Sequence, residues 1–292
     1  MKKKFKLFCF GFGQVSKYFV SNLIKNKFNF SLVTTNTSKT QVGKFNNLSY
    51  KSYYFKDGKF DKNLLKELKL ANKILISIPP LRNNDLVLNK FGKIFKKNKF
   101  DWVTYLSATS VYGNKMGKWV NESTTTKPTS KRGIARLNSE KNWLRYFKDF
   151  NLALQIFRLS GIYSNENNAL IRLKNRKLNI IEKKNQFFSR IHIEDIAKIL
   201  TISLSKFKSG QIFNISDDRP CSNNEIARYA ARLLKMSSPT IIRLPDVKNK
   251  MLKDFFRDSK KVSNKKMKKF FSYKLKYPDY KKGLRVIKNN IF

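Results

Sequence analysis

Two closely spaced glycines near the start of the chain have the spacing of a phosphate-binding turn. Gly11 and Gly13 follow an apolar run that ends at Phe10, and apolar residues at helical spacing begin at Val15. A glycine turn between a strand and a helix lets backbone N–H groups and the positive helix end approach a pyrophosphate. Ser16 stands where a third glycine often stands, and its small side chain still permits close helix–strand packing. The alternative is an ordinary tight β–α turn, which can use two glycines without any ligand.

The segment after the second expected strand would select the dinucleotide. The residues that follow Thr35 are Asn36, Thr37, Ser38 and Lys39, with no acid among them. An NAD-binding protein usually places Asp or Glu here to hold the ribose hydroxyls. Hydroxyl groups and a lysine suit a 2′-phosphate instead, so we expect NADP, with NAD as the alternative. The competing interpretation is a polar loop with a chance lysine.

Strands and helices alternate around these motifs. Besides the first strand and its helix, we expect strands at residues 30–35, around 53, and at 74–78, 102–106, 153–159 and 211–215, and helices at 64–70, 130–147, 194–205, 222–235 and 263–270. This order predicts α/β architecture with a Rossmann-type doubly wound parallel sheet. We expect a dinucleotide-binding Rossmann domain at 1–165 and a smaller mixed α/β substrate lobe at 166–292, with residues about 190–216 returning to the sheet.

The chain is strongly basic but rich in large apolar side chains. It has 292 residues, 63 Lys+Arg against 19 Asp+Glu and a net charge of +44, together with 25 Phe, 12 Tyr and 3 Trp. The aromatic residues can build a core, which excludes wholesale disorder. The basic residues are scattered from end to end without a nucleic-acid-binding motif, so we do not expect nucleic acid as a partner. The densest cluster, between Lys260 and Lys269, is the best candidate for a polyanion contact.

Cysteine usage and hydropathy bound the location of the protein. Cys9 and Cys221 are too few and too far apart for a disulfide scaffold. The longest apolar runs fall far short of the roughly 20 residues that span a bilayer. We therefore expect a cytoplasmic protein with no membrane partner and no metal, as a monomer or a homodimer.

Further motifs resemble a known family. They are Ser107-Ala108-Thr109-Ser110-Val111-Tyr112-Gly113, Pro128-Thr129-Ser130 with Glu140, Arg158-Leu159-Ser160-Gly161-Ile162-Tyr163, Arg190-Ile191-His192-Ile193-Glu194-Asp195-Ile196 and Phe213-Asn214-Ile215-Ser216-Asp217-Asp218. With the glycine turn, they are similar to the extended short-chain dehydrogenase/reductases, the NAD(P)-dependent epimerase/dehydratase family, and closest to an atypical subgroup. The resemblance runs from residue 4 to about 284. It implies a nicotinamide dinucleotide and an oxidoreductase or epimerase/dehydratase activity on a small molecule such as a nucleotide-sugar or a carbonyl compound.

The chain departs from the family where the family keeps its catalytic pair. The resemblance places Arg132 and Arg136 at the positions of the usual Tyr-x-x-x-Lys, and Ala108 at the usual active-site hydroxyl. Spacing of four keeps both arginines on one helix face. A guanidinium with a pKa above roughly 12 does not exchange protons near neutral pH, but it binds phosphate or carboxylate. We therefore expect the pair to hold an anion; the alternative is a structural tie to carboxylates such as Glu140.

Other polar residues could replace the missing groups. Ser107 is the best remaining hydroxyl for contacting substrate or nicotinamide. Tyr112 has suitable chemistry, although this turn more often packs structurally. His192, the single histidine, could titrate near neutral pH but is expected to be structural. Arg158 and Arg190 could line a cleft or act as buried tethers.

The predicted site collects residues from all of these motifs. The candidate catalytic residues are Ser107, Tyr112, Arg132 and Arg136. The candidate cofactor-binding residues are Gly11, Gly13, Gln14, Val15, Thr35, Asn36, Ser38, Lys39, Ile78, Pro79, Ser107 and Arg136. Three functions stay open at this point: an NADP-linked oxidoreductase or epimerase-like enzyme, a non-catalytic NADP-binding sensor or interaction protein, and a basic nucleic-acid-associated protein.

Overall fold

The computed structural model describes residues 4–81, 84–183, 185–248, 253 and 256–291. Its strands are β1 (Phe5–Phe10), β2 (Phe30–Asn36), β3 (Gln41–Phe45), β4 (Leu48–Lys56), β5 (Lys59–Phe60), β6 (Lys73–Ile76), β7 (Trp102–Ala108), β8 (Trp119–Val120), β9 (Leu154–Leu159), β10 (Gly161–Tyr163), β11 (Ile180–Glu182), β12 (Arg190–His192), β13 (Gln211–Ile215), β14 (Ile241–Arg243) and β15 (Lys261–Val262). Its α-helices are α1 (Gln14–Lys25), α2 (Leu64–Lys69), α3 (Leu86–Lys97), α4 (Lys131–Phe150), α5 (Ala169–Lys174), α6 (Ile193–Ser203), α7 (Asn223–Leu234), α9 (Lys265–Phe271) and α10 (Tyr280–Ile291), with 3₁₀ turns η1 (Thr109–Tyr112) and η2 (Leu244–Asp246).

A large sheet forms the centre of the fold. Its strands lie in the order β13-β9-β7-β6-β1-β2-β4-β3, and β5 pairs with β4. The pairs β7–β6, β6–β1, β1–β2 and β2–β4 are parallel, whereas β3 and β5 run antiparallel to β4. The predicted α/β class and the mostly parallel Rossmann-type sheet are therefore confirmed.

The chain divides into two compact units that alternate along the sequence. Unit 1 comprises residues 1–107, 135–158 and 197–213, and unit 2 comprises residues 108–134, 159–196 and 214–292.

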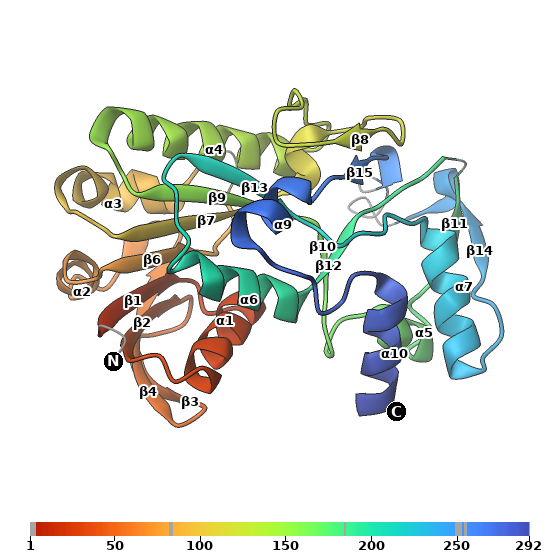
Figure 1. Ribbon diagram of the computed structural model, residues 1–292, viewed down its shortest axis with the longest axis horizontal. Helices are drawn as coiled ribbons and strands as arrows, with labels where there is room; N and C mark the ends of the chain where they lie inside the picture. The colour runs from red at the N-terminus through yellow and green to blue at the C-terminus, as the bar shows by residue number, and fades with distance from the viewer. Residues whose placement is uncertain (1–3, 82–83, 184, 249–252, 254–255, 292) are drawn as a thin grey trace. The chain divides into compact units, whose positions relative to one another are not determined.

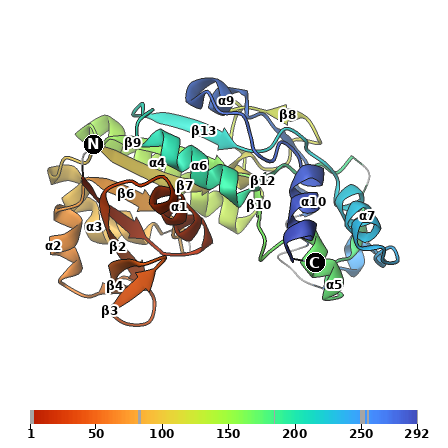
Figure 2. The same ribbon diagram turned by 60° about the horizontal axis from the view of Figure 1, so that its bottom comes forward.

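Unit 1 is a three-layer arrangement around the sheet (Figure 1). Alternation along β1 directs Phe8 and Phe10 into one core, which they share with buried residues of α2, α3 and α4. On the other face Phe19 of α1 stacks on Trp102 of β7 at 6.0 Å between ring centroids. The Trp102 indole also donates to Ser203 of α6, and Figure 2 shows α1 and α6 together on this face. The turns that follow the carboxyl ends of β1, β2 and β6 carry the predicted cofactor-binding residues.

The connection from β2 to β4 differs from the expected βαβ rhythm. The segment between these two parallel strands contains no helix. It contains β3, which lies on the outer side of β4 and forms a hairpin with it in the register Gln41↔Ser52 to Phe45↔Leu48. Periodicity did not predict β3, because this strand is only five residues long and mostly exposed.

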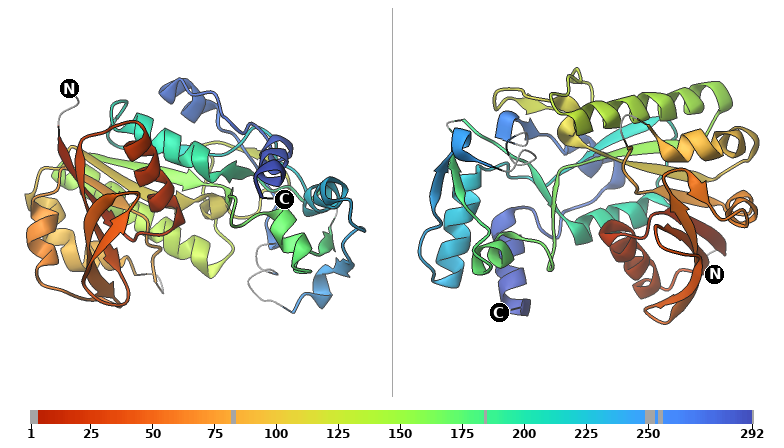
Figure 3. Two further views of the ribbon diagram at one scale, coloured as in Figure 1. Left: turned by 90° about the horizontal axis from the view of Figure 1, so that it is seen from below. Right: turned by 180° about the vertical axis from the view of Figure 1, so that it is seen from behind.

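Unit 2 has its own core. Helices α5, α7 and α10 pack around apolar side chains that include Leu170, Ile226 and Leu284, each at most 4% exposed (Figure 3). A short parallel pair, β11–β14, and a second pair, β10–β12, contribute strands to the same unit. Among the residues that the structure describes, no helix combines the length and the apolar character needed to cross a bilayer.

Candidate functional site

The two glycines of the turn between β1 and α1 are required for different reasons. Gly11 has a φ of 86°, and a Cβ there would lie 2.7 Å from Ile78 Cγ2 and 2.8 Å from Ser77 Oγ. Gly13 has φ −79° and ψ −168°, which any residue can adopt. A Cβ at Gly13 would meet no heavy atom within 4 Å among the described residues. The fold itself thus needs a glycine at 11, whereas at 13 it leaves open space against the backbone.

The amino end of α1 suits an anion. Gly13 is the N-cap residue, so no side chain caps the helix, and the first turn contains no acidic residue. Uncapped helix ends carry N–H groups and a partial positive charge, which favour phosphate. Gln14 and Val15, the next two predicted cofactor-binding residues, form the first turn of this helix. A pyrophosphate therefore fits this turn on both shape and charge.

Ser16 occupies the third-glycine position and is fully buried. Its hydroxyl lies 3.0 Å from the carbonyl oxygen of Gly11 and 3.1 Å from Ser77 Oγ. Ser77, after β6, in turn lies 2.9 Å from the carbonyl oxygen of Phe10. These hydrogen bonds fasten the end of β1 to α1 and to the end of β6, so the serine supports the turn directly.

Thr35 and Asn36 organise the turn and the loop after β2. The Gly11 N–H donates to the buried Thr35 Oγ1 at 2.8 Å. The Asn36 amide donates to the carbonyl oxygen of Lys39, and Asn36 Oδ1 accepts from the N–H groups of Ser38 and Lys39. The structure therefore places Thr35 and Asn36 as supports, while Ser38 and Lys39 are the exposed ones among the predicted residues of this loop.

The turn lies where the order of the strands changes direction. β1 pairs with β2 on one side and with β6 on the other. In doubly wound sheets such a switch point, at the carboxyl ends of the strands, is where dinucleotides bind. Ile78 and Pro79 follow β6. Ile78 lies against the turn, since its Cγ2 is the heavy atom nearest to a Cβ built on Gly11.

Ser107 lies near the end of β7 in unit 1, and Arg136 of α4 reaches the same end of that strand. Ser107 is 2% exposed, and its hydroxyl has no hydrogen-bond partner within the described part of the chain. Arg136 Nη1 donates at 2.6 Å to the carbonyl oxygen of Leu106, the residue that precedes Ser107. A buried hydroxyl without a partner beside a cationic side chain is consistent with a polar ligand at this strand end.

The carboxylate of Glu140 is bound by another arginine. Arg158 Nη2 lies 2.7 Å from Glu140 Oε2, and both side chains are at most 5% exposed. Arg158 is therefore a buried tether. Arg136 instead donates to the backbone carbonyl of Leu106, so the alternative of a tie between Arg136 and Glu140 receives no support.

Tyr112 and Arg132 belong to unit 2. Tyr112 is fully buried, and its hydroxyl donates to Asn214 Oδ1 at 2.8 Å. This placement favours the packing interpretation of Tyr112 over proton transfer. Arg132 is exposed in the first turn of α4, just after Ser130, whose hydroxyl accepts from the Gly133 N–H.

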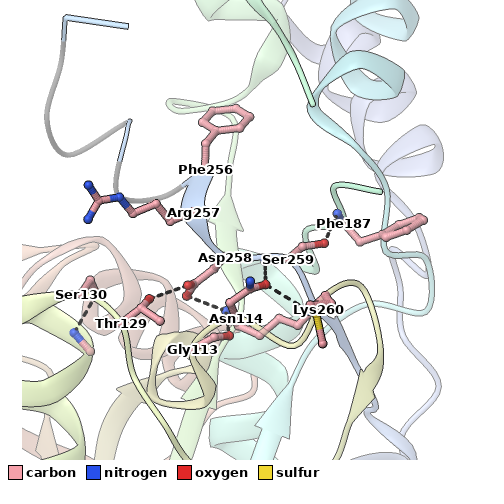
Figure 4. A network of polar contacts seen from close by, with 12 residues as sticks. Gly113, Asn114, Thr129, Ser130, Phe187, Phe256, Arg257, Asp258, Ser259 and Lys260 are labelled. Carbon is pink, nitrogen blue, oxygen red and sulfur yellow. Dashed lines mark hydrogen bonds and ion pairs between the residues drawn. The ribbon is translucent and has the colours of Figure 1, made fainter. Parts of the chain in front are cut away.

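A polar clamp holds the chain after Tyr112 (Figure 4). Lys260 is 9% exposed, and its ammonium donates to the carbonyl oxygen of Gly113 and to Asp258 Oδ2, each at 3.0 Å. Asp258 Oδ1 accepts from the Thr129 hydroxyl, and the Ser259 N–H donates to Asn114 Oδ1 at 3.0 Å. Residues 258–260 thus fix both the segment after η1 and the segment before α4.

His192 is buried and structural in its placement. It is 1% exposed and packs with its ring centroid 3.8 Å from that of Tyr277. Burial lowers its pKa to about 4, so the ring is neutral near pH 7. The neighbouring Asp195 accepts hydrogen bonds from Tyr273 and from the N–H groups of Lys276 and Tyr277. Together the two residues fasten the segment before α10.

Unit 2 contains a cavity that sequence reasoning missed. Its volume is about 320 Å³, and its lining includes Tyr163, Arg172, Lys177 and Arg190. Desolvation and the charge of Arg190 lower the pKa of Arg172, so two guanidinium groups lie near one another. Arg190 is anchored through Nη1 to the carbonyl oxygens of Phe188 and Cys221. Of these cations the sequence analysis named only Arg190, as a residue that could line a cleft, and the structure places it in the lining. Arg172 and Lys177 lie outside the motifs, and nothing distinguishes them from the other basic residues of the chain.

Relatives found by sequence match about half of the chain, whereas solved structures match nearly all of it. No family model matches it. A dTDP-D-glucose 4,6-dehydratase of Dictyostelium discoideum is 26% identical over an alignment of 173 residues that covers 52% of this chain and 39% of the relative. The matched segment therefore spans about two fifths of that relative's length.

Solved structures match nearly the whole chain. A conserved protein of unknown function from Silicibacter pomeroyi is 28% identical with a TM-score of 0.83, covering 98% of this chain and 99% of that one. UDP-glucuronic acid 4-epimerase from Bacillus cereus, in complex with UDP-glucuronic acid and NAD, is 18% identical with a TM-score of 0.77, covering 97% and 98%. The resemblance seen in the sequence is thus confirmed: the chain has the extended short-chain dehydrogenase/reductase fold of the NAD-dependent epimerases and dehydratases to which it is similar.

Proposed function

We propose that the chain binds a nicotinamide dinucleotide with its pyrophosphate at the turn between β1 and α1. The observation that carries this proposal is the open space over Gly13 at an uncapped helix end. Gly11, Gly13, Gln14 and Val15 would hold the pyrophosphate, and Ser107 would face the nicotinamide side. When bound, the dinucleotide would supply hydride transfer.

NADP is the proposed form, with NAD as the alternative. Support comes from the loop after β2, where Ser38 and Lys39 are exposed and residues 37–40 include no acidic side chain. A charge-assisted contact of Lys39 with a 2′-phosphate should be worth about tenfold or more in affinity. The bound dinucleotide of the solved epimerase is NAD, so this preference concerns the present chain alone.

Titration of reduced dinucleotides by fluorescence tests the preference. NADPH should bind at least about tenfold more tightly than NADH, and Lys39→Met should remove most of the difference. Lys25→Met is the matched control, because Lys25 is exposed at the far end of α1. Equal affinities, or tighter NADH, would refute the NADP assignment and leave the dinucleotide site itself in place.

We further propose an oxidoreductase or epimerase/dehydratase-like reaction on a small anionic substrate. The cavity of unit 2, with Arg172, Lys177 and Arg190 in its lining, supports an anionic group on that substrate, as in a nucleotide-sugar. Arg132 and Arg136 would bind an anion and could not exchange a proton at neutral pH. Proton transfer would therefore need a group outside the family's usual pair.

A non-catalytic NADP-binding sensor is the second candidate. The same arginines and Ala108 favour it, since the usual proton-transfer groups are missing. The experiment that separates the two is incubation of the full chain with oxidised dinucleotide and UDP-glucose or UDP-glucuronic acid. Appearance of reduced nicotinamide or of an altered sugar supports an enzyme. Saturable dinucleotide binding without either product, across these sugars and a panel of carbonyl compounds, supports a sensor.

A further inference from the structure

Three aromatic side chains meet beside the glycine turn. Phe12, between the two glycines, has its ring centroid 5.3 Å from that of Phe45 and 5.0 Å from that of Tyr50. All three rings are half-buried, so part of each face or edge remains accessible. Phe45 and Tyr50 come from the β3–β4 hairpin, which follows β2 in the chain.

The hairpin is fastened at its tip and at its base. The Asn46 amide at the tip donates to Ser21 Oγ of α1 at 2.9 Å. Near the base, the Asn36 amide donates to Ser52 Oγ at 2.8 Å. The hairpin is therefore held against α1 and against the end of β2, which fixes the position of its rings.

Gly43 sets the position of Tyr50. The two residues face each other across the hairpin, and a Cβ on Gly43 would lie 2.7 Å from Tyr50 Cζ and 2.8 Å from its hydroxyl oxygen. Any side chain at 43 would thus push the tyrosine ring from its place beside Phe12.

The cluster lies on the β2 side of the turn, which is the side where doubly wound folds bind the adenosine half of a dinucleotide. In the strand order, β4 and β3 continue beyond β2, whereas β6 and β7 lie on the opposite side of β1. Ribose recognition in doubly wound folds takes place at the end of the second strand. A rigid aromatic surface at this point suits a planar heterocycle and its ribose.

We propose that Phe12, Phe45 and Tyr50 form an aromatic platform for the adenosine half of the dinucleotide, and that Gly43 positions it. This inference rests on the proposed dinucleotide binding. It makes the hairpin a determinant of affinity, in addition to the phosphate turn.

Binding of ADP and NADPH to the full chain tests the platform. Tyr50→Leu should weaken both probes by about threefold to tenfold, and Tyr50→Phe should keep most of the wild-type affinity. Gly43→Ala should weaken both probes as well. Val42→Ala is the matched control, because Val42 is 74% exposed on the same strand and should leave both affinities unchanged.

The outcomes separate this inference from the proposed function. Wild-type affinity for both probes in Tyr50→Leu and Phe45→Leu would overturn the platform while leaving the dinucleotide site intact. Weaker NADPH binding with unchanged ADP binding would also overturn it, because the effect would then lie outside the adenosine half. Absence of any wild-type binding would refute the proposed function itself.

Discussion

Replacing each glycine of the turn by alanine should separate folding from ligand binding. At Gly11 the positive φ of 86° costs an alanine about 1–2 kcal/mol. The overlap of its Cβ with Ile78 and Ser77 at 2.7–2.8 Å adds a packing cost of about 1–3 kcal/mol. We therefore expect Gly11→Ala to lower the free energy of unfolding by about 2–5 kcal/mol, which is the sum of these two ranges.

Gly13→Ala should behave in the opposite way. The backbone at 13 is compatible with alanine and no described atom lies within 4 Å of the new Cβ, so stability should change by less than about 1 kcal/mol. Gly13→Val adds bulk where the pyrophosphate must approach, and should weaken NADPH binding by about tenfold or more.

Urea denaturation and fluorescence titration of the same preparations decide the matter. A Gly11→Ala protein as stable as wild type would refute the backbone argument. A folded Gly13→Val protein with wild-type NADPH affinity would show that the open space over Gly13 is not the pyrophosphate site.

Three further predictions concern charged and titratable side chains. The folded pKa of His192, about 4, lies below its ordinary 6.5, so below pH 6.5 the unfolded chain takes up a proton that the folded chain does not. Roughly 3 kcal/mol of the free energy of unfolding should therefore be lost as the pH falls to 4. Unfolding of wild type and His192→Gln at a series of pH values should show a weaker pH dependence in the variant, and parallel curves would contradict this. Glu140→Gln leaves the buried Arg158 guanidinium without its charge partner and should cost about 3 kcal/mol or more in urea unfolding, against a prediction of no change if the pair were solvated. Arg132→Ala and Arg136→Ala should weaken NADPH or UDP-glucuronic acid binding with little loss of melting temperature, whereas unchanged affinities with a clear drop in melting temperature would make the pair structural.

Local sequence signals were sufficient for the first half of the site. The run ending at Phe10, the two glycines and the apolar spacing from Val15 define a strand, a turn and a helix within some 20 residues, and the structure has β1 and α1 there. The helix over Leu86–Lys97, which was not predicted, has a comparable local signal, because Asp85 caps its amino end.

Contacts between distant residues could not be predicted in the same way. The hydroxyl of Tyr112 is bound by Asn214, about a hundred residues later, and the arginine that binds Glu140 is Arg158 rather than one on its own helix. Residue types permit such pairs, but only packing selects them. For the same reason the sequence did not bring Arg172, Lys177 and Arg190 together in one cavity. The β3 strand was missed for a different reason, because it is short and mostly exposed.

The most direct test of the account is calorimetric titration of the purified full chain with NADPH, repeated with Gly13→Val. We predict saturable binding of about one dinucleotide per chain to the wild type. The folded variant should bind about tenfold or more weakly. Absence of saturable binding to the wild type would contradict the central claim that the turn between β1 and α1 holds a dinucleotide.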